Sequence, residues 1–249
     1  MKNPMLKKFA SSGKRQLKII PFLFTFSNAL FGFLSVVKTL DEQYIAAAWC
    51  IVLAAIMDML DGRLARFLGS TSYVGRELDS LCDAVSFCFA PAILMYSWSL
   101  FALGKIGLIV LGLFLCCGLF RLARFNVIYA HQTNYFIGLP TTIAAFFVAQ
   151  IVLSESSIAH SILHSALRPE RIAFIVSMIA LLMISSIKFP SGKYLKMRLA
   201  LTGLIMILGI LAAAAWWQGY PIFLFLVSFY IIGGFALGIL KEIMRPLIK

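Results

Sequence analysis

Eight long apolar runs, separated by short polar segments, make up most of the chain. Each run reaches or approaches the roughly 20 residues that a helix needs to cross a bilayer, and no strand-like alternation is present. The runs cover residues 21–38, 44–67, 77–99, 104–128, 139–155, 170–188, 198–217 and 221–241. The pattern predicts an all-α fold, a polytopic membrane helical bundle of about eight transmembrane helices.

Composition and charge agree with a membrane protein, because 61% of the residues are hydrophobic. Lys and Arg are concentrated in the amino-terminal segment and in alternate loops, so both termini and the loop after the second run are expected in the cytoplasm. The net charge of +12 is explained by contact with anionic headgroups and does not indicate a nucleic-acid partner. We expect a basic cytoplasmic or interfacial arm (1–19), a transmembrane core (20–195) and two additional C-terminal helices (196–249).

Four aspartates occur in or beside the second and third apolar runs, where a carboxylate costs several kcal/mol. Asp58 and Asp61 share one helix face, and Asp79 and Asp83 share another. The segment 67–75 is rich in glycine and small polar residues and predicts a turn, so the two helices form a hairpin that gathers the four carboxylates. An all-oxygen site of this kind suits Mg²⁺, Mn²⁺ or Ca²⁺, and four carboxylates are enough for two ions.

Small and basic residues lie beside these aspartates. Gly62 and Ala65 would let a nucleotide approach the backbone; the alternative explanation of small residues is close helix packing. Arg66 has the geometry to bind a diphosphate, or it anchors the helix at the cytoplasmic surface. Gly75 either begins the third helix or approaches the nucleotide.

Two other regions carry candidate binding groups. Arg121 and Arg124 are three residues apart near the inner end of the fourth run, with Asn126 beyond them. They either flank the span as topology signals or recognise an anion, such as a phosphate or an amino acid carboxylate. Lys188 belongs to a basic turn that holds lipid phosphate or sets the topology.

A polar face also interrupts the first apolar run. Thr25, Asn28 and Gly32 follow one another at three- and four-residue spacing. An Asn inside a span usually hydrogen-bonds to another helix; the alternative is that Asn28 contacts the substrate at the aspartate site.

The aspartate region resembles the signature D-x2-D-G-x2-A-R-x8-G-x3-D-x3-D of the CDP-alcohol phosphotransferase family. All eight fixed positions are matched, by Asp58, Asp61, Gly62, Ala65, Arg66, Gly75, Asp79 and Asp83. The resemblance implies a metal-dependent enzyme with two Mg²⁺ or Mn²⁺ ions held by the four aspartates. It also implies that Asp83 acts as general base, and that the protein is a homodimer of the cell (inner) membrane with its active site facing the cytoplasm.

Several other stretches are similar to the family members that use serine as the acceptor. They include residues 77–87, 121–126, 138–140 and 185–191, and Cys88 departs from this subgroup, which usually has glycine there. The resemblance implies transfer of a phosphatidyl group from CDP-diacylglycerol to L-serine, with CMP as the second product. Two alternatives remain: another acceptor, such as glycerol 3-phosphate, an inositol phosphate or choline, or, outside the enzyme class, a cation transporter.

Overall fold

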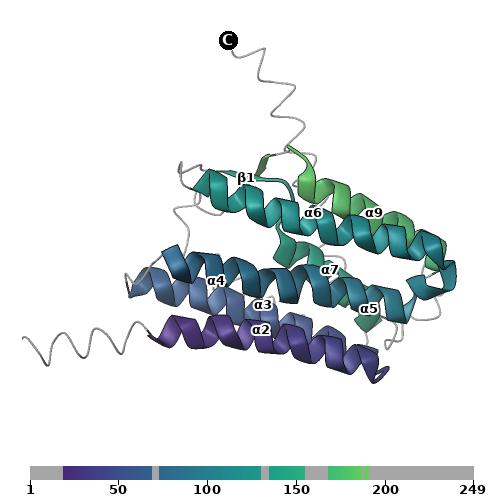
Figure 1. Cartoon of the computed structure of the whole chain (residues 1–249), viewed down its shortest axis with the longest axis horizontal. Coiled ribbons are helices and arrows are strands. Elements are labelled where there is room, and N and C mark those ends of the chain that lie inside the picture. The colour runs from purple at the N-terminus through teal and green to yellow at the C-terminus, as the bar shows by residue number, and fades with distance from the viewer. Residues whose placement is uncertain (1–18, 69–72, 130–134, 155–167, 187, 191–249) are drawn as a thin grey trace, which may run out of the picture.

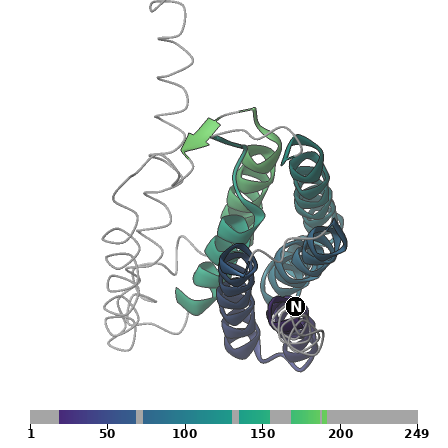
Figure 2. The ribbon, with the colours of Figure 1, turned by 90° about the vertical axis from the view of Figure 1, so that its left-hand side faces the viewer.

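The structure is a computed structural model that describes residues 19–68, 73–129, 135–154, 168–186 and 188–190 (Figure 1). Nearly all of the amino-terminal arm and both predicted C-terminal spans lie outside these residues. The described part is mainly helical, and four of its helices are long and apolar enough to cross a membrane. Seen in Figure 2, these helices form one bundle. The prediction of a helical membrane protein is therefore confirmed, whereas the number of eight spans stays a prediction.

The first two helices form an antiparallel pair that packs along its whole length. α2 spans Ile19–Leu40 and α3 spans Tyr44–Phe67, close to the predicted runs 21–38 and 44–67. The turn between them is tight: the Gln43 N–H donates to the Lys38 carbonyl at 2.8 Å, and Glu42 has a left-handed φ of 59°. This tight turn places the two chain segments side by side (Figure 1).

The third span contains an interruption. α4 (Tyr73–Asp83) passes into a π-helix, η1 (Ala84–Phe89), and then into α5 (Ala90–Trp98), which together cover 26 residues. Pro91 lies at the start of α5. Because proline has no N–H and its ring clashes with the preceding turn, regular α-helical bonding cannot continue through it, and a wider π-turn accommodates the change. The interruption begins directly after Asp83.

The remaining elements complete the bundle. A 3₁₀ turn, η2 (Leu100–Leu103), leads into α6 (Lys105–Tyr129), followed by α7 (Thr141–Ser154) and α9 (Pro169–Ile184). Two short strands, β1 (Tyr135–Ile137) and β2 (Lys188–Pro190), pair antiparallel. The two strands have three residues each and satisfy backbone groups by pairing, so the described fold agrees with the predicted all-α class apart from this small sheet.

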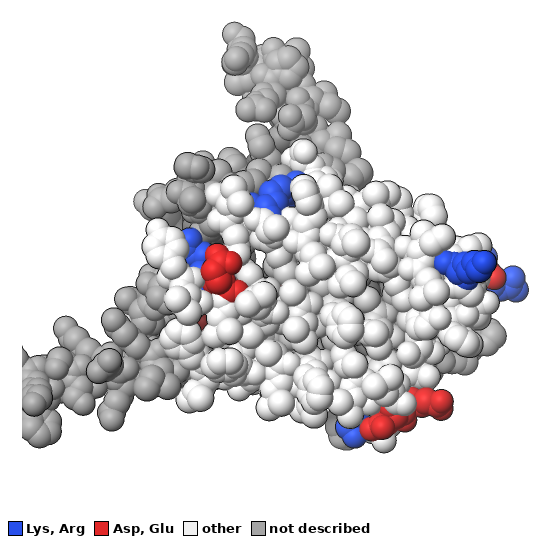
Figure 3. All heavy atoms as spheres, viewed as in Figure 1, with Lys and Arg blue, Asp and Glu red and all other residues white. Residues whose placement is uncertain are grey.

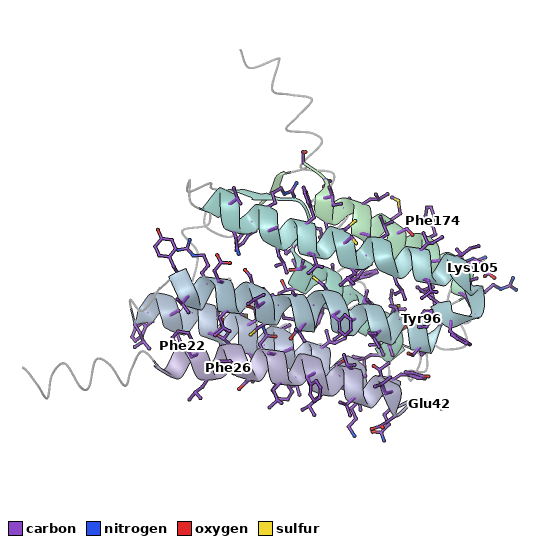
Figure 4. All side chains as sticks on the ribbon, viewed as in Figure 1. Phe22, Phe26, Glu42, Tyr96, Lys105 and Phe174 are labelled. Atoms are coloured by element: carbon purple, nitrogen blue, oxygen red, sulfur yellow. The ribbon has the colours of Figure 1, made fainter. Side chains whose placement is uncertain are left out.

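The outer surface has the character of a membrane protein. On the face in Figure 3, charged side chains lie toward the ends and edges, and the broad middle carries none. Along α2, Leu23, Phe26, Leu30 and Phe33 are all more than half exposed, although they are large and apolar. Figure 4 shows Phe22 and Phe26 toward one end of the bundle and Glu42 and Lys105 toward the other. Such a surface is stable when lipid covers the apolar band.

Candidate active site

Three of the four predicted aspartates meet between α3 and α4. Asp58 and Asp61 lie one turn apart on α3, and Asp79 lies on α4. One carboxylate oxygen from each lies within 4.8 Å of the other two, a spacing at which a single ion contacts all three. Asp61 is only 4% exposed, and the buried Oδ1 of Asp79 has no hydrogen-bond partner among the described residues. These residues therefore fit a divalent cation.

Asp83 lies one helical turn further along α4 and is held differently. Its Oδ1 accepts a hydrogen bond of 3.0 Å from Nδ2 of Asn28 on α2. Asp83 follows Asp79 by four residues on α4 and therefore lies on the same helix face, where the charges of Asp58, Asp79 and Asp61 act on its carboxylate. The predicted quartet is thus arranged as three clustered carboxylates and a fourth that a neighbouring helix orients.

The α2 helix approaches the π-helix closely at this point. Asn28 is fully buried, and its backbone carbonyl accepts a 2.9 Å hydrogen bond from Ser86 Oγ. One turn along, a Cβ on Gly32 would lie 2.7 Å from Ser86 Cα, so only glycine fits there. Thr25, on the same face of α2, is also buried. The polar face that the sequence predicted is therefore a contact face toward Asp83 and the π-helix.

The remaining signature residues flank the hairpin turn. Gly62 and Ala65 are partly buried on α3 after Asp61, and Gly75 is partly buried in the first turn of α4. The side chain of Arg66 lies outside the described residues. Gly62, Ala65 and Gly75 thus lie at the same end of the hairpin as the acidic group.

Arg121 is a buried cation on α6. Its side chain is only 7% exposed, and Nη1 donates to Thr141 Oγ1 at 3.1 Å. The guanidinium also lies 5.2 Å from the centre of the Phe125 ring, a cation–π contact. The charges of Asp83 and Asp58 attract it.

Arg124 has a different environment from Arg121. Its Nη1 donates to the Ile184 carbonyl at 2.9 Å, and Nη2 donates to the carbonyls of Met183 at 3.2 Å and Ser185 at 3.4 Å. These carbonyls lie at the carboxyl end of α9, where a cation stabilises the helix. Gly138, with a φ of 78°, packs against this guanidinium. Arg124 therefore ties α6 to α9.

The other two predicted acceptor-site residues lie near this end of α6. Asn126 bridges α6 and α4, because its Oδ1 accepts from Ser80 Oγ at 3.0 Å and its Nδ2 lies 3.4 Å from Glu77 Oε2. The backbone of Lys188 belongs to β2, and its side chain is outside the described residues. Asn126 is therefore in contact with α4, which carries Asp79 and Asp83.

Sequence reasoning did not single out Ser86 and Thr141 as parts of this site. Ser86 is one hydroxyl in an apolar run, and nothing in its spacing distinguishes it from a packing residue. Thr141 follows Gly138-Leu139-Pro140 at the start of α7, and a threonine at a helix start is a common signal for local backbone contacts rather than for a bond to arginine.

Comparisons with known proteins agree with this geometry. The chain is 36% identical over 192 residues to "CDP-diacylglycerol--serine O-phosphatidyltransferase" of Helicobacter pylori (strain ATCC 700392 / 26695), covering 77% of this chain and 80% of that one. The Bacillus subtilis (strain 168) protein of the same name is 32% identical over 177 residues, covering 71% of this chain and 93% of that one. "Archaetidylserine synthase" of Methanothermobacter thermautotrophicus is 37% identical over 173 residues, covering 69% of each.

The family comparison covers more of the chain than any of these relatives. The model of the CDP-alcohol phosphatidyltransferase family matches residues 18–232, which include every helix and strand described above. The chain therefore belongs to the CDP-alcohol phosphatidyltransferase family.

Proposed function

We propose that this protein transfers the phosphatidyl group of CDP-diacylglycerol to the hydroxyl of L-serine, giving phosphatidylserine and CMP. The main support for a metal-dependent transfer is that carboxylate oxygens of Asp58, Asp61 and Asp79 lie within 4.8 Å of one another. The relatives named as serine O-phosphatidyltransferases support serine as the acceptor. No contact in the described residues favours glycerol 3-phosphate, an inositol phosphate or choline.

Asp58, Asp61, Asp79 and Asp83 would hold Mg²⁺ or Mn²⁺, with two ions as the proposed number. When bound, the ions polarise the diphosphate and neutralise the charge of the departing CMP. A cation at this site also offsets the repulsion among four acidic side chains at membrane depth.

Asp83 is the proposed acceptor of the proton from the serine hydroxyl. The serine oxygen forms a new bond to the phosphatidyl phosphorus, the bond from that phosphorus to the CMP oxygen breaks, and the hydroxyl proton passes to Asp83. Asn28 donates to Oδ1 of Asp83 and so limits the rotation of the carboxylate. Asn28 would thus assist the reaction through Asp83.

Gly62, Ala65 and Gly75 would leave room for the nucleotide beside the acidic group, and Arg66 would bind the diphosphate. The acyl chains would stay in the bilayer next to the exposed apolar faces of the bundle. From the distribution of Lys and Arg, we place the active site on the cytoplasmic side of the inner membrane, with both termini on that side. We also propose a homodimer, and the apolar runs 198–217 and 221–241 are the basis for proposing two further C-terminal spans.

The test is a CMP-release assay on purified enzyme with CDP-diacylglycerol, a divalent cation and a panel of acceptors. We expect CMP release with L-serine, and loss of this activity in Asp83→Asn. Asp41→Asn is the matched control, because Asp41 is an exposed carboxylate in the turn between α2 and α3. CMP release that depends on a different alcohol would refute serine as acceptor, and full activity of Asp83→Asn would refute the site.

A further inference from the structure

We propose that Arg121, which reaches from α6 to the first residue of α7, binds the carboxylate of the acceptor amino acid. This contact would make the enzyme select serine over a simple amino alcohol. This inference rests on the proposed function. It concerns one residue of the pair 121 and 124, which the sequence alone could not separate. Three features of the described residues support it: a buried guanidinium whose Nε has no hydrogen-bond partner, its contact with a helix start, and its position on the face of α6 toward the segment that carries Asp83.

The first feature is the incomplete hydrogen bonding of Arg121. A guanidinium has five N–H donors, and burying it is costly unless they are paired. Arg121 is 7% exposed, its Nη1 bonds to Thr141, and its Nε has no hydrogen-bond partner among the described residues. A carboxylate is the group whose planar pair of oxygens best satisfies adjacent guanidinium donors.

The second feature is the amino end of α7. Thr141 is the first residue of this 14-residue helix, and it is the residue that holds Nη1 of Arg121. The first N–H groups of a helix have no partner within the helix and carry partial positive charge. An anion bound by the Arg121 guanidinium would therefore also lie near the positive end of α7.

The third feature is the position of Arg121 relative to Asp83. Gly118, three residues before Arg121 on α6, packs against Cys88 in the π-helix that follows Asp83. Residues three apart share a helix face, so Arg121 lies on the face of α6 turned toward the segment that carries Asp83, and the charge of Asp83 attracts it. In serine a two-carbon spacer separates the hydroxyl from the carboxylate. The hydroxyl and the carboxylate of serine are therefore close together, and in the proposed pose the hydroxyl faces Asp83 while the carboxylate lies toward α6, at Arg121.

Arg124 is the natural comparison within the same helix. Both of its Nη atoms donate to carbonyls at the end of α9, so its guanidinium already has acceptors. Replacing it is expected to affect the packing of α6 against α9 and not the selection of the acceptor. The two arginines thus form a matched pair for an experiment.

An anionic group could also come from the diphosphate of CDP-diacylglycerol, and kinetics distinguish the two sources. We would measure CMP release for Arg121→Gln and Arg121→Lys, varying L-serine and CDP-diacylglycerol separately. Ethanolamine, which is serine without its carboxylate, serves as a second acceptor. We expect the apparent KM for serine to rise about 10- to 100-fold, the KM for CDP-diacylglycerol to change less than about twofold, and any turnover of ethanolamine to be preserved.

Two further variants keep the test decisive. Thr141→Val retains the arginine and removes only its orienting bond, so we expect a smaller rise in the serine KM, about three- to tenfold. Arg124→Gln should lower the melting temperature and leave the serine KM unchanged. An unchanged serine KM in the Arg121 variants, or equal rises for serine and CDP-diacylglycerol, would overturn the inference. Absence of serine-dependent CMP release in the wild-type enzyme would instead overturn the proposed function.

Discussion

Substitution of Asn28 by alanine tests whether α2 orients the proposed base. The change removes the Nδ2 donor that lies 3.0 Å from Asp83 Oδ1. The amide Oδ1 of Asn28 has no hydrogen-bond partner among the described residues, so its loss leaves no donor unsatisfied there. The consequence should therefore fall mainly on Asp83.

The size of the effect follows from the type of bond. A hydrogen bond to a charged group contributes about 1.5–3 kcal/mol. If this bond holds Asp83 in its reactive orientation, its loss appears in the transition state, and each 1.4 kcal/mol lowers the rate about tenfold. We expect kcat to fall about 10- to 100-fold for Asn28→Ala. Asn28→Asp should be at least as damaging, because it removes the donor and adds a like charge.

The assay is CMP release in detergent micelles, with saturating L-serine and CDP-diacylglycerol. Ser86→Ala is the matched control: it removes the 2.9 Å bond between the π-helix and the Asn28 carbonyl and leaves the donor to Asp83 in place. We expect the control to keep kcat within about threefold of wild type. Equal losses of kcat in both variants would show that only packing matters. A raised KM for CDP-diacylglycerol with unchanged kcat would show that Asn28 contacts the substrate directly.

Three further predictions concern the helix contacts and the cation. Arg124→Gln removes the donors to the carbonyls of Met183, Ile184 and Ser185 and should destabilise the fold by about 1–3 kcal/mol, measured as a lower melting temperature in detergent; an unchanged melting temperature would contradict this role. A Cβ on Gly118 would lie 2.6 Å from Cys88 Sγ, so Gly118→Ala should cost about 1–3 kcal/mol, and Cys88→Gly in the same chain should recover part of it; additive losses would exclude the contact. Treatment with EDTA should abolish CMP release, and Mg²⁺ or Mn²⁺ should restore it; activity that survives complete chelation would argue against a cation-dependent reaction.

The sequence predicted the elements that depend on local patterning. The run 44–67 coincides with α3, and the interval between the aspartate pairs predicted the hairpin that brings Asp79 to Asp58 and Asp61. These successes have a common cause: apolar length defines a span, and residue spacing within two adjacent helices defines which side chains meet.

The sequence could not show that Arg121 and Arg124 make different contacts. Both lie on one side of α6, and their surroundings depend on which segments far along the chain pack nearby. The start of α7 faces Arg121, and the end of α9 faces Arg124. The pairing of β1 with β2 is likewise a contact between distant segments, so local patterning did not reveal it.

The π-helix after Asp83 was also not predicted, because an apolar run reads as one uniform helix. Pro91 marks the place where α-helical bonding must change, but the sequence does not say whether the helix kinks, ends or widens there. The widening lies against Gly32 and Asn28 of α2. The geometry around Asp83 therefore depends on a tertiary contact as well as on the proline.

Anomalous diffraction from crystals of the enzyme grown with CDP-diacylglycerol and Mn²⁺ tests directly whether these aspartates hold a cation. The proposed site predicts anomalous peaks between α3 and α4, within bonding distance of carboxylate oxygens of Asp58, Asp61 and Asp79, and loss of these peaks in Asp61→Asn. Mn²⁺ bound elsewhere, with these three carboxylates empty beside an ordered CDP-diacylglycerol, would contradict it.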